Sequence, residues 1–135
     1  MTEIHALAAA DVARALAEDI GSGDLTAALI AANAAGEASI ISREHAVLCG
    51  QAWFEQAFAQ LDASAVVHWH CAEGTQCAPN QVLCEVRGNA RAMLSAERTA
   101  LNVLQLLSGT ATLVHRYVSE VRGTRAKIVD TRKTL

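Results

Sequence analysis

The sequence lacks the features of membrane, secreted and nucleic-acid-binding proteins. No apolar run approaches the roughly 20 residues that a transmembrane helix needs. The net charge of −3 at pH 7 leaves no broad basic face for a nucleic acid. The alanine-rich N-terminus has no basic segment and carries four acidic residues, unlike a secretory signal. We therefore expect a cytoplasmic protein in a reducing compartment, with its four cysteines as free thiols.

Several common site patterns are missing as well. The histidines and cysteines between residues 68 and 84 include no Cys-x2-Cys pair, and on a strand Cys71 would face away from His68 and His70. Buried thiols and surface imidazoles are therefore favoured over a zinc site. The loop GSGDLT (residues 21–26) has neither the Gly-Lys-Ser/Thr ending nor the strand-to-helix context of a phosphate loop, so a structural turn is favoured.

What the sequence does have is a clear pattern of helices and strands, with 52% hydrophobic residues to build a core. Apolar residues three and four apart predict helices over residues 4–20, 54–61, 90–107 and 113–121. Alternating or short apolar runs predict strands over residues 37–42, 46–49, 65–71, 82–88 and 126–131. All eight glycines fall at the predicted breaks, including Gly109 between the last two helices.

This order of elements predicts an α+β fold. Strands in antiparallel hairpins, with helices to cover one face, indicate an open α/β sandwich, which we assign to an N-terminal domain over residues 1–112. Residues 113–135 are assigned to a connecting helix and an apolar strand with polar residues at its tip, which is how a parallel α/β barrel begins. One strand makes no barrel, so the sequence looks truncated. Without parallel neighbours, the strand over residues 126–131 should be mobile, rearranged or sheltered by another chain.

Two cations close that last strand. Arg132 offers a planar fork that suits carboxylates, and Lys133 offers a point charge that suits phosphates. At the C-terminal end of a parallel strand, such side chains face the usual ligand crevice. A solvated, frayed tail is the alternative, because chain termini are commonly loose. The pair by itself leaves both interpretations open.

A third cation interrupts the helix after residue 90. Arg98 lies in an apolar stretch, with Asn102 one turn later on the same face. A charge in an apolar helix is costly unless it is paired or used. Pairing with Glu85 or Glu97 is the structural alternative to a binding role.

Three stretches of the chain closely resemble the quinolinate phosphoribosyltransferase family, the carboxylating nicotinate-nucleotide pyrophosphorylases of NAD biosynthesis. They are EDIGSGDLTA (residues 18–27), RGNARAMLSAERTALNVLQLLSGTAT (87–112) and GTRAKIVDTRKTL (123–135). The resemblance implies an N-terminal α/β sandwich, followed by an incomplete α/β barrel that holds the active site. It also implies a cytoplasmic homodimer.

The resemblance further implies a reaction. The ring nitrogen of quinolinate attacks the anomeric carbon of 5-phosphoribosyl 1-pyrophosphate and releases pyrophosphate, with Mg²⁺ assisting. Loss of the 2-carboxylate as CO2 then gives nicotinate mononucleotide. By position, Arg98 matches a residue that binds a quinolinate carboxylate in the partner subunit's site. Thr131, Arg132 and Lys133 match the segment that receives quinolinate, and Lys133 also lies near the phosphoribosyl substrate in a catalytic role.

The resemblance also implies what this chain does not contain. The family continues with a Pro-Gly-Leu-Arg-like stretch, a His-Arg pair, a further lysine and acidic residues for the sugar and the metal. We therefore expect the Mg²⁺ ligands beyond residue 135, none within the chain, and no turnover by this polypeptide alone. The alternatives are a non-enzymatic binding or dimerisation module with a solvated basic tail, and a related enzyme acting on another pyridine acid.

Overall fold

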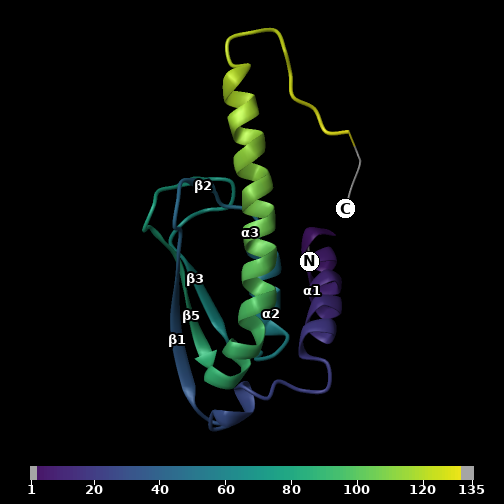
Figure 1. The fold of residues 1–135 in the computed structure, drawn as a ribbon, viewed down its shortest axis with the longest axis vertical. Helices are drawn as coiled ribbons and strands as arrows, with labels where there is room; N and C mark the ends of the chain where they lie inside the picture. Colours follow the sequence, from purple (N-terminus) through teal and green to yellow (C-terminus); the bar gives the residue numbers. More distant parts are fainter. Residues whose placement is uncertain (1–2, 132–135) are drawn as a thin grey trace.

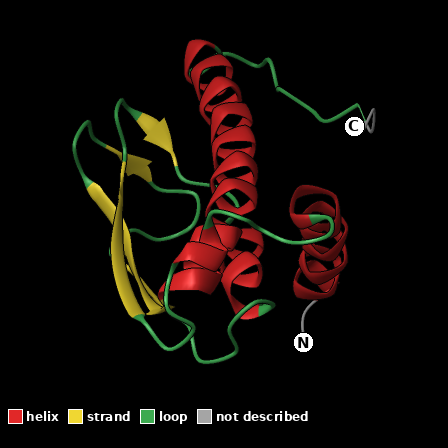
Figure 2. Cartoon of the chain, turned by 60° about the horizontal axis from the view of Figure 1, so that its bottom comes forward, coloured by secondary structure: helices red, strands yellow, loops and turns green. Residues whose placement is uncertain are grey.

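The computed structural model describes residues 3–131, and the structural statements below concern those residues (Figures 1 and 2). Three α-helices and one 3-10 helix combine with five strands. In chain order they are α1 (Glu3–Ile20), η1 (Ala27–Leu29), β1 (Ala35–Ile41), β2 (Ala46–Val47), α2 (Gln51–Ala59), β3 (Val66–Trp69), β4 (Gln76–Cys77), β5 (Val82–Asn89) and α3 (Ala90–Glu120). Helices cover one face of a small sheet, which confirms the predicted α+β class.

The main sheet is antiparallel, with the strand order β1-β5-β3. Val86 of the central strand lies opposite Ala38 on one side and Val67 on the other. A register shift between Ile40 and Ile41 marks a bulge in β1. β2 and β4 form a separate two-stranded sheet. β2 lies in the predicted apolar run over residues 46–49, whereas β4 was not predicted because Gln76-Cys77 belongs to no apolar or alternating run.

The core lies between this sheet and the helices. Phe54 of α2 is fully buried, and its ring packs against Phe58 at 5.0 Å and edge-on against Trp69 at 5.2 Å between centroids. α1 turns Val12 and Leu16 to the core, and α2 packs against both α1 and α3. The amphipathic spacing predicted for α1 and α2 is thus confirmed.

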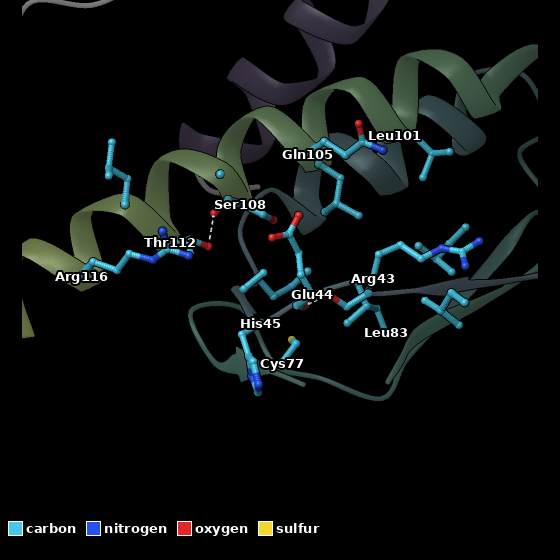
Figure 3. A pocket seen from close by; sticks show the side chains of 18 residues that line it. Arg43, Glu44, His45, Cys77, Leu83, Leu101, Gln105, Ser108, Thr112 and Arg116 are labelled. Atoms are coloured by element: carbon cyan, nitrogen blue, oxygen red, sulfur yellow. Dashed lines mark hydrogen bonds between the residues drawn. The ribbon is translucent and has the colours of Figure 1, made fainter. Parts of the chain in front are cut away.

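One long helix replaces the two that the sequence predicts at its C-terminal end. α3 runs without interruption from Ala90 to Glu120, so the predicted break at Ser108-Gly109 is wrong. The Ser108 and Thr112 hydroxyls accept hydrogen bonds from the backbone N–H groups of Cys49 and Val47. The helix continues past both residues (Figure 3). The predicted domain boundary between residues 112 and 113 falls inside this helix and stays a prediction.

The predicted strand over residues 126–131 is not formed. After α3 the chain turns at Gly123, whose φ is +83°, and runs back on the side of α1 (Figure 1). Residues 126–131 have no regular secondary structure, and Ile128 and Val129 are exposed. A strand needs neighbours to pair its N–H and C=O groups, and the described part of the chain offers none there. None of the helices in residues 3–131 is long and apolar enough to cross a membrane.

Candidate functional site

Arg98 lies on the surface of α3 and pairs with α1. Its Nη1 donates a hydrogen bond to Oδ1 of Asp19 at 2.8 Å. The predicted alternatives, pairing with Glu85 or Glu97, are therefore wrong. The Arg98 side chain remains 74% exposed, against 23% for Asp19. Because a guanidinium has five N–H donors, the contact with Asp19 leaves others available to a ligand.

A shallow hollow surrounds this pair where α3 passes the end of α1. Its volume is about 450 Å³, and its walls come from both helices. Asn102 lines it one turn after Arg98, as the spacing in the sequence predicts, and its side chain is exposed. The hollow thus offers a guanidinium and an amide, two groups that donate hydrogen bonds to carboxylates, and the carboxylates of Glu18 and Asp19 also line it.

The loop after α1 holds the two helices together beside this hollow. Asp24 accepts hydrogen bonds from the Ala27 N–H at 2.9 Å and the Ser95 hydroxyl at 2.8 Å. These bonds, that from Ala27 first, lower the pKa of Asp24. Arg91 donates from α3 to the carbonyls of Ala28 and Ile30. The GSGDLT loop is therefore a structural turn, as predicted, and it anchors α1 to α3.

The second group of predicted site residues lies at the other end of the described chain. Thr131 is exposed and is the last described residue, while Arg132 and Lys133 lie outside the described residues. Arg98 lies 22 residues before Glu120, the last residue of α3, which corresponds to about 33 Å along the helix axis. The predictions for Thr131, Arg132 and Lys133 stay predictions.

The side chains with zinc-ligand chemistry are buried thiols and surface imidazoles, as the sequence predicts. Cys71, Cys77 and Cys84 are buried free thiols, and His68 and His70 are exposed on β3 and just after it. Desolvation by burial, together with neighbouring groups, raises the pKa of Cys77 to about 11 and that of Cys84 to about 12. Within residues 3–131, no three His, Cys, Asp or Glu side chains are placed to hold a metal ion. The Mg²⁺ ligands expected beyond residue 135 stay a prediction.

A larger groove lies on the other side of α3. It has a volume of about 610 Å³ between α3 and the segment that joins β1 to β2 (Figure 3). Its floor is apolar, with Leu48, Leu83 and Leu104. Arg43 and Arg116 lie near its two ends, and Glu44 extends into the middle (Figure 3). No motif in the sequence indicates this groove.

Comparisons with known proteins define the family. Residues 24–108 match the family model described as "Quinolinate phosphoribosyl transferase, N-terminal domain". This match spans more than half of the chain. The chain therefore belongs to that family, and the predicted resemblance is confirmed.

Individual relatives agree with this result. The chain is 38% identical over 117 residues to a probable nicotinate-nucleotide pyrophosphorylase (carboxylating) of Bacillus subtilis, with 87% of this chain and 40% of the relative covered. It is 39% identical over 131 residues to the Mycobacterium leprae nicotinate-nucleotide pyrophosphorylase (carboxylating), covering 92% of this chain and 45% of the relative. The structure of the nicotinate-nucleotide pyrophosphorylase from Francisella tularensis superposes with a TM-score of 0.91 at 37% identity, over 97% of this chain and 47% of that one. The chain thus spans less than half the length of these relatives.

Asp19 is the site residue that the sequence analysis missed. The signal that points to it is electrostatic. The last turn of α1 contains Glu18 and Asp19 and no basic residue, although carboxylates are unfavourable at the negative end of a helix dipole. A cation from another element stabilises two such carboxylates, and Arg98 of α3 forms an ion pair with Asp19.

Proposed function

We propose that this chain forms the N-terminal part of a quinolinate phosphoribosyltransferase, which converts quinolinate and 5-phosphoribosyl 1-pyrophosphate to nicotinate mononucleotide, CO2 and pyrophosphate. The observation that carries the proposal is the exposed guanidinium of Arg98, oriented by Asp19 in a surface hollow of a domain of this family. The relatives named above are pyrophosphorylases of this kind. The protein acts in the cytoplasm in this proposal.

The chemistry suits the residue types. Quinolinate is a dianion, and a protein with a net charge of −3 needs a local cation to bind it. A guanidinium that holds one ring carboxylate aims the ring nitrogen at the anomeric carbon, which is catalysis by positioning. The new N–C bond forms as the C–O bond to pyrophosphate breaks. The 2-carboxylate then leaves as CO2, and a proton replaces it on the ring.

The remaining roles in the proposal belong to the end of the chain. Thr131 and Arg132 receive quinolinate, and Lys133 contacts both quinolinate and the phosphoribosyl donor as a catalytic group. A lysine suits this place because an ammonium pairs with the developing charge on a leaving phosphate. The segment belongs to the region after residue 112, which we propose as the start of the catalytic domain.

Arg98 is proposed to act in the active site of a second subunit of a homodimer. Two features of the chain support this arrangement. Along α3, Arg98 lies about 33 Å from Glu120, beyond which the chain with the other proposed site residues continues. The last turns of α3 also extend past the sheet with Leu113, Val114, Tyr117 and Val118 exposed, an apolar surface that a second subunit would bury in this proposal (Figure 1).

The proposal is tested by Arg98→Ala in the protein as its source makes it, assayed with quinolinate and 5-phosphoribosyl 1-pyrophosphate. Loss of a charge-assisted hydrogen bond, about 1.5–3 kcal/mol, lowers kcat/KM for quinolinate by roughly ten- to a hundredfold or more. The matched control is Arg87→Ala, which breaks another exposed ion pair at 2.8 Å, with Glu37 on the sheet. The control keeps normal kinetics. Near-normal kinetics for Arg98→Ala would refute the role of Arg98.

The exposed apolar surface of α3 also favours a second candidate, a non-enzymatic binding or dimerisation module. Calorimetric titration of the 135-residue chain with quinolinate distinguishes the two. Binding that Arg132→Ala abolishes supports the enzyme. A chain that self-associates and ignores quinolinate, from a source protein of the same 14.3 kDa mass, supports the module.

A further inference from the structure

We infer that Asp19 is a positioning residue for quinolinate binding, which holds the guanidinium of Arg98 in the orientation that receives a substrate carboxylate. This inference rests on the proposed role of Arg98 and adds a second residue, from a different helix, to the same site. The contact behind it is the 2.8 Å hydrogen bond between Arg98 Nη1 and Asp19 Oδ1.

The two partners differ in how firmly the fold holds them. The Asp19 side chain is less exposed than that of Arg98, although the residue lies at the surface, and its helix is held against the core by Val12 and Leu16. The loop that follows is tied to α3 through Asp24 and Ser95 at 2.8 Å. Arg98, in contrast, projects into solvent from its helix. The carboxylate is therefore the fixed partner, and the guanidinium takes its orientation from it.

The cost of placing Asp19 where it lies argues against an accidental surface pair. Two carboxylates at the C-terminal end of α1 oppose the helix dipole, with no basic residue in the last turn to offset them. Isolated surface ion pairs contribute little to stability, so stability alone is a weak reason for this arrangement. Orientation of an otherwise free arginine is a stronger one.

Two effects of Asp19 on an anionic substrate oppose each other. Its negative charge repels the substrate, and the exposed position of the pair weakens this repulsion because water has a high dielectric constant. Its hydrogen bond restricts a long side chain before the substrate arrives, which reduces the entropy lost on binding. The ligand touches Arg98 directly, so orientation dominates, and removal of Asp19 weakens binding.

The test uses Asp19→Asn and Asp19→Ala in the protein as its source makes it. Each variant raises the KM for quinolinate by about three- to tenfold, the size expected when a pre-organised group is freed. The KM for 5-phosphoribosyl 1-pyrophosphate changes less than about twofold, because the phosphoribosyl donor does not use this hydrogen bond. Asp19→Glu keeps the charge and restores most of the affinity. The control is Glu18→Gln, which removes the neighbouring charge in the same turn and does not raise the KM for quinolinate.

A double-mutant cycle with Arg98→Ala separates positioning from a structural role. Once Arg98 is absent, Asp19→Ala causes no further loss, whereas a structural defect would add its own. Additive losses overturn the inference, and so does tighter quinolinate binding by Asp19→Asn, which would make Asp19 a competitor for Arg98. Normal kinetics for Asp19→Ala, which removes the acceptor, with impaired Arg98→Ala refute the inference alone. Normal kinetics for Arg98→Ala refute the proposed function itself.

Discussion

The hydroxyl of Ser108 on α3 exchanges two hydrogen bonds with the backbone of Cys49, accepting from its N–H at 3.0 Å and donating to its carbonyl at 3.1 Å. One turn later, the hydroxyl of Thr112 accepts from the Val47 N–H at 2.8 Å. A helix thus supplies the partners that a neighbouring strand would give to the backbone around β2. These bonds connect the middle of α3 to the segment that contains β2.

Replacement of Ser108 by alanine should therefore destabilise the chain. The Cys49 N–H and C=O lose their partner in a half-buried position, which lowers the free energy of unfolding by about 1–3 kcal/mol. The control is Thr110→Ala, because the exposed Thr110 hydroxyl donates only to the Leu106 carbonyl of its own helix at 3.0 Å. Urea denaturation of the 135-residue chain measures both variants. Equal midpoints would show that the Ser108 contacts contribute nothing.

Gly109→Ala should stabilise the same helix. A Cβ at this position meets nothing within 4 Å, and the residue lies inside α3. Alanine lowers the conformational entropy of the unfolded chain and raises the free energy of unfolding by about 0.5–1 kcal/mol. A rise in the thermal midpoint of the isolated chain is the expected result. A fall would mean that α3 is not continuous through Gly109.

Gly88→Ala should have the opposite effect. A Cβ there would lie 2.8 Å from Asp62 Oδ2 and 3.2 Å from the Cβ of Ala65. The same carboxylate oxygen accepts the Asn89 N–H at 2.8 Å, just before α3 begins, so it cannot move without losing that bond. We expect a loss of about 1–3 kcal/mol, as for other overpacked sites. Thermal denaturation beside Gly109→Ala measures the contrast, and a neutral Gly88→Ala would contradict this packing.

The buried thiol of Cys84 predicts a loss of stability at alkaline pH. Desolvation raises its pKa from its ordinary value near 9 to about 12, while the unfolded chain ionises at the ordinary value. The stabilisation is present below about pH 9. Above that, the folded state binds more protons, so the free energy of unfolding falls as pH rises toward 12, by at most about 1.4 kcal/mol per pH unit for one thiol.

Cys84→Ala checks this slope. The variant loses packing at every pH, so only the difference between urea midpoints at pH 8 and pH 10.5 is informative. That difference should shrink relative to the unmodified chain. Cys49 and Cys77, whose pKa values are also raised to about 11, account for the part that remains. An unchanged difference would exclude Cys84 as a source of the alkaline loss.

Local pattern was sufficient for much of this structure. Val12 and Leu16 on α1, and Phe54 and Phe58 on α2, follow the helical period, because an isolated amphipathic helix has one face to bury. The stretch around Arg98, residues 87–112, was also sufficient to indicate the family by its resemblance to known sequences. The predicted break at Ser108-Gly109 was wrong because serine and glycine only disfavour a helix, and tertiary contacts can outweigh that preference. Here the Ser108 hydroxyl serves the Cys49 backbone, 59 residues away in sequence.

By itself, then, the sequence determined the α+β class, the faces of α1 and α2, the family, and Arg98 as a candidate ligand for carboxylates. Tertiary structure alone decided that α3 is one helix, that residues 126–131 form no strand, and that Arg98 pairs with Asp19 rather than with Glu85 or Glu97. The reason is the range of the interactions. Helical periodicity and motifs act within a few turns of chain, whereas a strand needs neighbours and a charge takes the partner that folding brings to it, here one 79 residues away.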